Sequence, residues 1–374
     1  MPGDKGTVLY VGGFELPDRN PAAHRVINNA KILRELGYKV VFCGVDKEIK
    51  TIPTEPDMVS GFESFPVPYP TTTKKWVKQM FDISPYTDLI SRYSDIKFIF
   101  CYNLHAAPLR KLIKVARKRK IRLVADCTEW YENKFSFKPV KLIKCLDTYL
   151  CMRCFQKKCD GMIAISSYLG NYYKKYIKNI IIVPPLVDLS DEKYVFIQPK
   201  AKNAVPTFIY SGSPSAAKES LGDVVECFDN ITDIDFKLII VGVTKEQFTS
   251  IYGSAPENSK TEFRGRVSHR EAVNAVRESD YAIVIRPRTR VTMAGFPTKF
   301  AEAVSVGTAV IANDISDLKQ YLKDGKNGYL ISCEKIEEEF KRILSSKKKF
   351  VVESDTFDYK KYIEQFELFL ETVI

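Results

Sequence analysis

A glycine, a proline and a glutamate stand in the segment GFPTKFAEA, residues 295–303, at a spacing that suits binding of an anion. Gly295 permits a tight turn, and the pattern predicts a helix that begins at Pro297 or Thr298, because proline is favoured in the first helical turn. The free amides at such a helix start attract a negative group such as a diphosphate. Glu302 follows about one turn later, where its carboxylate can accept hydrogen bonds. The alternative is a surface glutamate on an ordinary amphipathic helix.

Positive side chains also occur near the ends of two predicted strands. Lys218 comes after the predicted strand 207–212 and lies where the next helix is expected to begin. A lysine beside Gly212 and a helix N-terminus can stabilise a departing diphosphate. Arg286 is the first of three arginines in IRPRTR, just before residues 295–303. A solvated helix lysine and a solvated arginine loop are the alternatives.

Two carboxylates follow a predicted strand in the first half of the chain. Asp126 ends the strand 121–126, and Glu129 comes three residues later. Side chains at the carboxyl end of a parallel strand can reach a ligand, so either group could orient or deprotonate a hydroxyl. The alternative is that Asp126 caps the next segment and that Trp130 fills the core.

A glycine pair ends the first predicted strand. Gly12 and Gly13 follow an apolar run and permit close backbone approach and a positive φ. Arg25 lies near the start of the next predicted helix, residues 22–36, where it can face a ligand. These three residues are further candidates for a site at the strand ends.

The elements that must position these residues alternate along the chain. Short β-branched runs alternate with longer amphipathic stretches, which is typical of a parallel sheet covered by helices on both faces. The segment 51–70 is interpreted as a loop, and the proline-rich segment 184–206 as a linker. The predicted strands are 7–12, 39–45, 97–103, 121–126, 161–165, 179–183, 207–212, 236–242, 281–287, 308–313 and 328–332.

The pattern restarts after the linker, which predicts an α/β fold of two Rossmann-like, doubly wound domains facing a cleft. The N-terminal domain is expected to span residues 1–190 and the C-terminal domain residues 191–356. Residues 357–374 have helical apolar spacing and no strand after them, so we expect a helix that crosses back to the first domain. Ligands in such sheets bind beyond the carboxyl ends of the strands.

Charge is unevenly distributed. Residues 1–190 carry 31 Lys and Arg against 18 Asp and Glu, whereas residues 191–374 carry 26 against 28, for a net charge of +11. The N-terminal half should therefore meet an anionic partner. Basic side chains with interleaved aromatics suit an anionic membrane surface. The candidates for contact with the membrane or an acceptor are Arg25, Lys74, Lys75, Trp76, Lys118, Arg119 and Trp130. Solvated helix faces and nucleic-acid binding are the alternatives, but no nucleic-acid-binding module is recognisable.

Several classes of protein are not expected from this sequence. No run of about 18 apolar residues and no signal-peptide pattern occur, so we expect a cytoplasmic protein that is at most peripheral on the inner face of the cell membrane. The 9 cysteines are expected to be reduced thiols. Cys145, Cys151, Cys154 and Cys159 cluster in an amphipathic stretch, where packing in a helix is favoured over a zinc site.

The segment 295–313 resembles the donor site of family 4 glycosyltransferases, which have the two-domain GT-B fold. Glu302-Ala303 followed by Gly307-Thr308-Ala309-Val310-Ile311 carries this resemblance. The family pattern often has an earlier glutamate, which would fall at Ala294. It also has an arginine five residues before the position of Lys218, which would fall at Ser213.

The resemblance implies a retaining transfer of a sugar from a nucleotide-sugar donor, without a metal or other cofactor. Glu302 would hold the ribose, and Lys218, helped by Lys299 and Arg286, would neutralise the diphosphate. The segment 263–272, with Arg266, would meet the nucleotide base. The remaining residues implied in donor binding are Gly12, Gly13, Gly212, Gly295, Phe296, Pro297 and Thr298.

The acceptor implied is a lipid-linked glycan in capsule, lipopolysaccharide or other surface polysaccharide synthesis. Two other functions stay open. One is a glycosyltransferase-like subunit that binds nucleotide sugar without turnover, which the departures at Ala294 and Ser213 favour. The other is a basic membrane- or nucleic-acid-binding protein without a small-molecule site.

Overall fold

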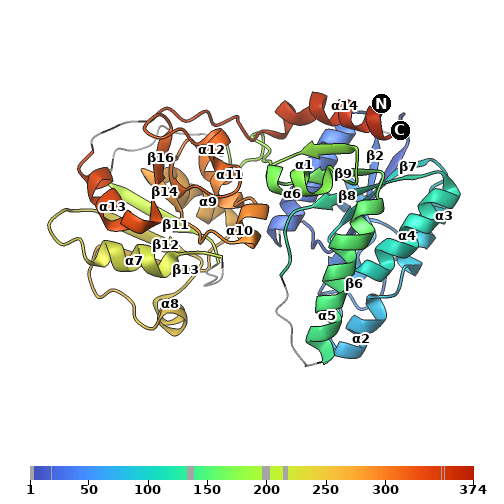
Figure 1. Cartoon of the computed structure of the whole chain (residues 1–374), viewed down its shortest axis with the longest axis horizontal. Coiled ribbons are helices and arrows are strands. Elements are labelled where there is room, and N and C mark those ends of the chain that lie inside the picture. The colour runs from blue at the N-terminus through green and yellow to red at the C-terminus, as the bar shows by residue number, and fades with distance from the viewer. Residues whose placement is uncertain are drawn as a thin grey trace. The chain divides into compact units, whose positions relative to one another are not determined.

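The computed structural model describes residues 4–17, 19–132, 139–195, 203–213, 218–346, 348 and 350–374. Contacts divide the chain into two compact units. Unit 1 is Met1–Leu186 with Tyr359–Ile374, and unit 2 is Val187–Asp358. Each unit is built on a mainly parallel sheet with helices packed against it (Figure 1).

The central sheet of unit 1 has the strand order β10-β9-β8-β7-β1-β2-β5-β4, and every neighbouring pair but β4–β5 is parallel. Strands β3 and β6 form a separate pair. The bounds are β1 (Thr7–Gly12), β2 (Lys39–Cys43), β3 (Val45–Asp46), β4 (Asp57–Val59), β5 (Phe62–Ser64), β6 (Val67–Pro68), β7 (Ile96–Tyr102), β8 (Arg122–Cys127), β9 (Gly161–Ala164) and β10 (Asn179–Ile182).

The loop predicted for residues 51–70 is wrong. This segment holds β4, β5 and β6. Phe62 is buried and packs on Phe42 of β2, so the hairpin extends the sheet beyond β2. Strands of two or three residues are too short for alternation to be recognised in the sequence.

Helices cover this sheet, and its central strands are mostly apolar. All six residues of β1 are buried, and Tyr10 packs on Phe14, Phe42 and Phe100 in the core. Helix α1 begins where proline can occupy the first turn, and the Asn20 side chain caps it by accepting from the amide of Ala23 at 2.9 Å. The helices of unit 1 are α1 (Pro21–Glu35), α2 (Thr73–Gln79), α3 (Ser84–Arg92), α4 (Ala106–Arg119), α5 (Pro139–Leu150), α6 (Ser167–Tyr173) and α14 (Ile363–Val373).

The cysteine-rich stretch continues α5 with a change of helix type. Cys151–Phe155 form a π-helical turn, and Gln156–Lys158 form a 3₁₀ turn. All nine cysteines of the chain are free thiols. No group of three or more His, Cys, Asp or Glu side chains that could hold a metal ion occurs among the described residues.

The C-terminal helix α14 packs into unit 1. Its Phe366, Phe369, Leu370 and Val373 are buried in the unit 1 core. A Cβ built on Gly161 of β9 would lie 2.8 Å from Cγ2 of Val373, so this glycine allows the helix to approach the strand closely. Burial of these four apolar side chains contributes about 1.5–3 kcal/mol each, which stabilises the packing of the C-terminal helix on unit 1.

The sheet of unit 2 has the order β13-β12-β11-β14-β15-β16, with every pair parallel. The strands are β11 (Thr207–Ser211), β12 (Lys237–Val241), β13 (Thr261–Gly265), β14 (Tyr281–Val284), β15 (Ala309–Asn313) and β16 (Gly328–Ile331). The helices are α7 (Leu221–Asp229), α8 (Lys245–Tyr252), α9 (His269–Glu278), α10 (Arg290–Ala294), α11 (Thr298–Ser305), α12 (Leu318–Tyr321) and α13 (Ile336–Leu344).

Parallel strands bring their carboxyl ends to one edge of each sheet. In unit 2 the order reverses beside β11, because β12 and β13 lie to one side and β14, β15 and β16 to the other. Loops that leave neighbouring strands in opposite directions create a place where a ligand can bind. Among the helices of the described residues, none has the length and apolar character needed to cross a bilayer.

Candidate functional site

A charged cluster lies at the carboxyl edge of the unit 2 sheet. Lys299 comes from the first turn of α11, Arg286 follows β14, and Glu219 stands in the connection between β11 and α7. The Lys299 Nζ donates to Oε2 of Glu219 at 3.0 Å, and Nη2 of Arg286 lies 2.7 Å from Oε1 of the same carboxylate. Three elements thus bring two cations and one anion together where a parallel sheet binds ligands.

Lys299 is held in a largely desolvated position. Its side chain is 12% exposed, and its Nζ lies 3.8 Å from the ring centroid of Tyr210 in β11. Burial lowers the pKa of Lys299 to about 8, although the Glu219 carboxylate acts to raise it. An anion that enters this site would meet a cation from which much of the water has been removed, which strengthens their attraction.

Glu302 lies on α11 one turn beyond Lys299 and faces α9. Its Oε1 is 3.0 Å from Nε2 of His269, the first residue of α9, and both side chains are partly exposed. Ser268 caps α9 by accepting from the amide of Glu271, which fixes where His269 stands. The histidine therefore orients a carboxylate that remains accessible. Sequence analysis did not single out His269, because its partner is 33 residues away.

The start of α11 is where the sequence predicted it, at Thr298 with Pro297 as the N-cap. The chain bends at Gly295 between α10 and α11, but its φ of −81° and ψ of 177° are open to any residue, so the bend does not require glycine. Phe296 is buried against Phe300 and Phe357, and its expected contact with a donor is corrected to a role in the core.

Gly212, a predicted donor-binding residue, has a backbone conformation that favours glycine. Its φ is +146°, and a Cβ at this position would lie 3.4 Å from Nζ of Lys299. The half-buried Lys218 is the neighbour of Glu219 in the same connection. Arg266 is exposed and directly follows β13, again at the carboxyl edge. The structure therefore places these three residues along one edge of the unit 2 sheet.

The roles expected of Asp126 and Arg25 in unit 1 are wrong. The Asp126 side chain is 0% exposed and pairs with Nε of Arg25 at 2.7 Å, while the Tyr10 hydroxyl donates to its other oxygen. Nη1 of Arg25 also donates to the carbonyl of Val183 at 2.9 Å. A carboxylate enclosed in this way cannot take a proton from a substrate, and an enclosed guanidinium cannot meet a membrane.

The residues that follow Asp126 at the end of β8 differ in their exposure. Glu129 is partly exposed two residues beyond β8 and stays a candidate for contact with an acceptor. Trp130 is buried against Tyr172, with ring centroids 4.8 Å apart, so direct membrane contact by this side chain is wrong. Thr128 donates to the Tyr102 hydroxyl at 3.4 Å and is likewise buried.

Of the two glycines at the end of β1, only Gly12 is required for packing of the strands. Gly12 has φ +144°, and a Cβ there would lie 1.8 Å from the Tyr102 carbonyl oxygen of β7. Gly13 does not have a positive φ, and a Cβ there would make ordinary contacts with Asn103. The close approach required at Gly12 is therefore to the neighbouring strand, and contact of either glycine with a donor stays a prediction.

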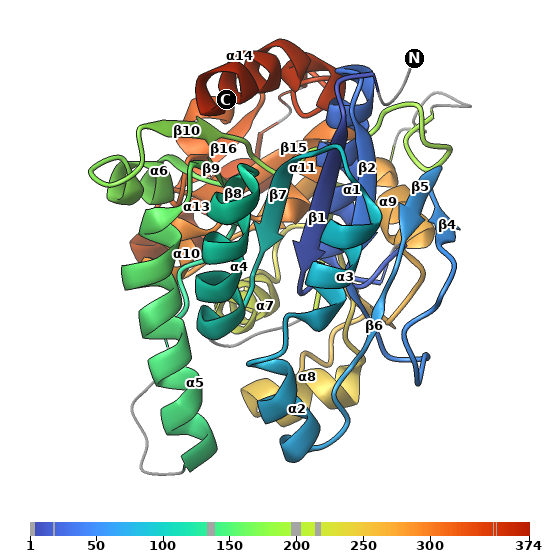
Figure 2. The same cartoon turned by 90° about the vertical axis from the view of Figure 1, so that its right-hand side faces the viewer.

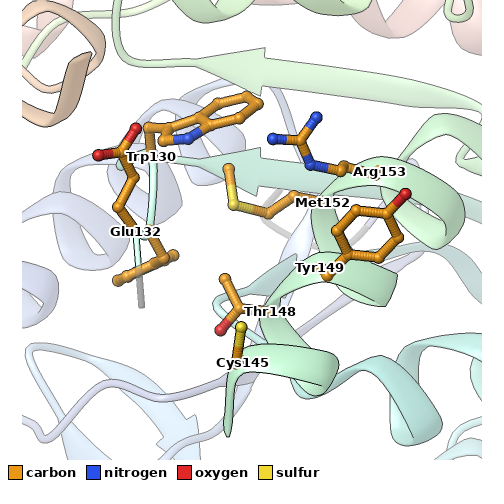
Figure 3. Close-up of a pocket in the computed structure, with 8 residues that line it drawn as sticks. Trp130, Glu132, Cys145, Thr148, Tyr149, Met152 and Arg153 are labelled. Atoms are coloured by element: carbon orange, nitrogen blue, oxygen red, sulfur yellow. The ribbon is translucent and has the colours of Figure 1, made fainter. Parts of the chain in front are cut away.

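A pocket of 330 Å³ opens beside Trp130 in unit 1 (Figure 3). The Arg153 guanidinium lies 5.3 Å from the ring centroids of both Trp130 and Tyr149. Aromatic rings, a carboxylate, a hydroxyl and a guanidinium border the same space, which is a lining suited to a small polar organic group. The pocket is lined by Trp130, Tyr131, Glu132, Cys145, Thr148, Tyr149, Met152 and Arg153.

Helix α5, which supplies part of the pocket lining, has an apolar face that is exposed to solvent. Leu142, Leu146 and Tyr149 stand four and seven residues apart, on one side of the helix, and all three are exposed. No residue of α5 is buried. Helices α2 and α5 both extend to the same end of unit 1 (Figure 2), and Nζ of Lys144 on α5 is 5.2 Å from the centroid of the Trp76 ring on α2.

The basic candidates in unit 1 fall into two groups. Lys74 and Lys75 are exposed on α2, near the carboxyl edge of the sheet. Lys118 and Arg119 are exposed at the end of α4, which runs back toward the amino edge where β8 begins. The first pair therefore lies with Trp76 and α5, and the second pair lies at the opposite edge.

Comparison with known proteins agrees with this architecture. Residues 195–365 match the family model "Glycosyl transferases group 1". Phosphatidyl-myo-inositol mannosyltransferase of Mycobacterium leprae is 31% identical over 118 residues, which are 31% of this chain and only 29% of that relative.

Two solved structures share the fold over nearly the whole chain. Sucrose-phosphate synthase from Thermosynechococcus elongatus has a TM-score of 0.72 at 12% identity, covering 98% of both chains. HepE of Anabaena in complex with UDP-glucose has a TM-score of 0.66 at 11% identity, covering 98% of this chain and 99% of that one. Residues 195–365 are therefore similar to the group 1 glycosyltransferases, and the chain has the GT-B fold of two Rossmann-like domains.

Proposed function

We propose that this protein transfers a sugar from a nucleoside-diphosphate sugar to a hydroxyl of a glycan acceptor. The observation that carries this proposal is the pair of largely enclosed cations, Arg286 and Lys299, close to Lys218 at the carboxyl edge of unit 2. A diphosphate is the ligand whose charge these groups suit. Glu302, which His269 contacts at 3.0 Å, lies on the same helix as Lys299 and is the proposed acceptor of hydrogen bonds from ribose hydroxyls.

The proposed chemistry needs charge stabilisation at the leaving group. The bond between the anomeric carbon and the diphosphate oxygen breaks, and the oxygen takes the electron pair. The acceptor oxygen forms the new bond to that carbon, and its proton passes to an oxygen of the departing diphosphate. Cations that meet the diphosphate most strongly as its charge develops lower the barrier to this step. In this proposal the chain's own cations fill that role without a metal, and the anomeric configuration is retained.

The proposed acceptor is a lipid-linked glycan at the inner face of the cell membrane, in surface polysaccharide synthesis. The exposed apolar face of α5 and the lysines of α2 support membrane contact, because apolar side chains and basic groups together favour an anionic interface. The 330 Å³ pocket at the end of α5 is the proposed place for part of the acceptor. One relative is named for a lipid, phosphatidyl-myo-inositol.

Thermal stabilisation by nucleotides tests the donor site. The purified protein is heated with UDP, ADP, GDP and their sugar derivatives, without added metal. A ligand present at about 100 times its dissociation constant should add about 2.7 kcal/mol to the unfolding free energy. Stabilisation by one nucleotide that is reduced in Glu302→Ala supports the site. A folded protein that none of these ligands stabilises would contradict it.

A subunit that binds the donor without turnover is the second candidate. Ser213 replaces the expected arginine, and Ala294 is wholly buried in α10, so neither position supplies a donor-binding side chain. The two functions differ in turnover. Release of nucleoside diphosphate from the stabilising donor, lost in Lys218→Ala, would favour the enzyme. Donor binding without release, together with unchanged glycan output of cells carrying Lys218→Ala, would favour the subunit.

A further inference from the structure

Glu219 is a buried acid that the sequence analysis did not single out. Its side chain is 5% exposed, although it precedes α7 by only two residues and stands at a ligand-binding edge of the sheet. Both of its oxygens are engaged, one by Arg286 at 2.7 Å and the other by Lys299 at 3.0 Å. A carboxylate with both oxygens held by cations acts on a ligand only through those cations.

The two cations need an anion if they are to stay together. Arg286 is 15% exposed and Lys299 is 12% exposed, so both have lost most of the water that would stabilise their charge. Two like charges that share one partner repel each other strongly in a medium of low dielectric constant. Glu219 offsets this repulsion and still leaves the three groups with a charge of +1 when Lys299 is protonated. The cluster therefore remains attractive to an anion.

We propose that Glu219 is a positioning residue, which holds the Arg286 guanidinium and the Lys299 ammonium side by side so that both can bind the donor's diphosphate. This inference rests on the proposed donor site. It explains how the site can work with Ser213 in place of an arginine, because Arg286 reaches the cluster from β14 rather than from the connection after β11. The Nε of Arg286 is buried and has no hydrogen-bond partner in the part of the chain that the structure describes.

The charge of Lys299 links this arrangement to pH. Four groups lie around Lys299: Tyr210 on β11, Glu219 before α7, Arg286 after β14 and Glu302 on the same helix α11. Glu302 in turn contacts His269 of α9. Without the charge of Glu219, the pKa of Lys299 would fall below its value of about 8. Affinity for a diphosphate would then decline at a lower pH than in the wild-type protein.

The test is a calorimetric titration with UDP, ADP and GDP between pH 6 and pH 9.5. The variants are Glu219→Gln and Glu219→Asp, with Glu226→Gln on the exposed side of α7 as the matched control. Glu219→Gln should weaken the tightest-binding nucleotide by about tenfold or more at pH 7, as expected when a charge-assisted contact is lost, and should move the decline in affinity to lower pH. Glu219→Asp should recover part of the affinity, and Glu226→Gln should match the wild type.

A double-mutant cycle separates positioning from a purely structural role. If Glu219 acts through Lys299, the losses from Glu219→Gln and Lys299→Met will be less than additive in the double variant. The double variant also removes both members of the Glu219–Lys299 ion pair. If Glu219→Gln alone does not fold, Glu219→Asp, which keeps the charge, takes its place in the cycle. Additive losses, or a folded Glu219→Gln protein with wild-type affinity and the same pH midpoint, would overturn the inference. Failure of the wild-type protein to bind any of the three nucleotides would instead contradict the donor site itself.

Discussion

Arg25 and Asp126 form an ion pair of 2.7 Å in the interior of unit 1, with side chains that are 5% and 0% exposed. The pair joins α1 to the end of β8, and Arg25 also reaches the carbonyl of Val183 just after β10. These residues stand where a catalytic pair could be expected from their type and position. Their enclosure assigns them to the stability of the carboxyl edge.

We predict that Asp126→Asn destabilises unit 1 by about 3–5 kcal/mol, because it leaves the guanidinium of Arg25 buried without a counter-charge. Urea unfolding followed by circular dichroism measures this loss. Glu55→Gln, which breaks the exposed pair with Arg92, should change the unfolding free energy by no more than about 0.5 kcal/mol. An Asp126→Asn protein as stable as the wild type would show that the pair is not needed.

We predict that Glu302→Gln weakens binding of a nucleoside diphosphate but not of inorganic pyrophosphate. The carboxylate on α11 is proposed to meet ribose, which pyrophosphate lacks. Loss of a hydrogen bond to a charged group costs about 1.5–3 kcal/mol, or about 10- to 150-fold in affinity. Calorimetry with both ligands measures the difference, and Glu278→Gln at the end of α9 is the control. Equal weakening of both ligands would place Glu302 at the phosphates instead.

We predict that affinity of the wild-type protein for a nucleoside diphosphate declines as the pH rises through about 8. The pKa of Lys299 is about 8, lowered by burial, so the side chain loses its proton and its attraction for the diphosphate above that pH. The same titration of Lys299→Met should show weaker binding with no decline in this range. A wild-type affinity that is constant from pH 7 to pH 9.5 would argue against contact between Lys299 and the diphosphate.

We predict that Leu142→Glu with Leu146→Glu reduces binding to vesicles of phosphatidylglycerol and phosphatidylcholine by at least about tenfold. Each leucine gains about 1.5–3 kcal/mol when it leaves water, and a carboxylate in its place is repelled by anionic lipid. Vesicle sedimentation measures the partition. Val351→Glu with Leu368→Glu is the matched control, since both residues are exposed and lie outside α5. A loss of equal size in the control would point to net charge rather than to the α5 face.

The order of elements could be predicted from the sequence, because hydrophobic period and helix caps are local properties. Strands β1 and β11 were predicted from the apolar residues within them. The start of α11 at Thr298 was predicted from the proline next to it. The strands of residues 51–70 could not be predicted, since they are only two or three residues long and their order depends on pairing with β2.

The candidate residues were identified by type and spacing, but their environments were not. Asp126 and Glu129 are alike in the sequence, and only the packing of α1 against β8 buries one of them beside Arg25 and leaves the other accessible. Glu219 meets Lys299 across 80 residues, and Arg286 reaches the same carboxylate from another strand. Local residue patterns are enough to give the alternation of strands and helices and the helix start that favours an anion. The tertiary structure decided which charges lose their water and share a partner, because desolvation and pairing depend on the neighbours that folding brings together.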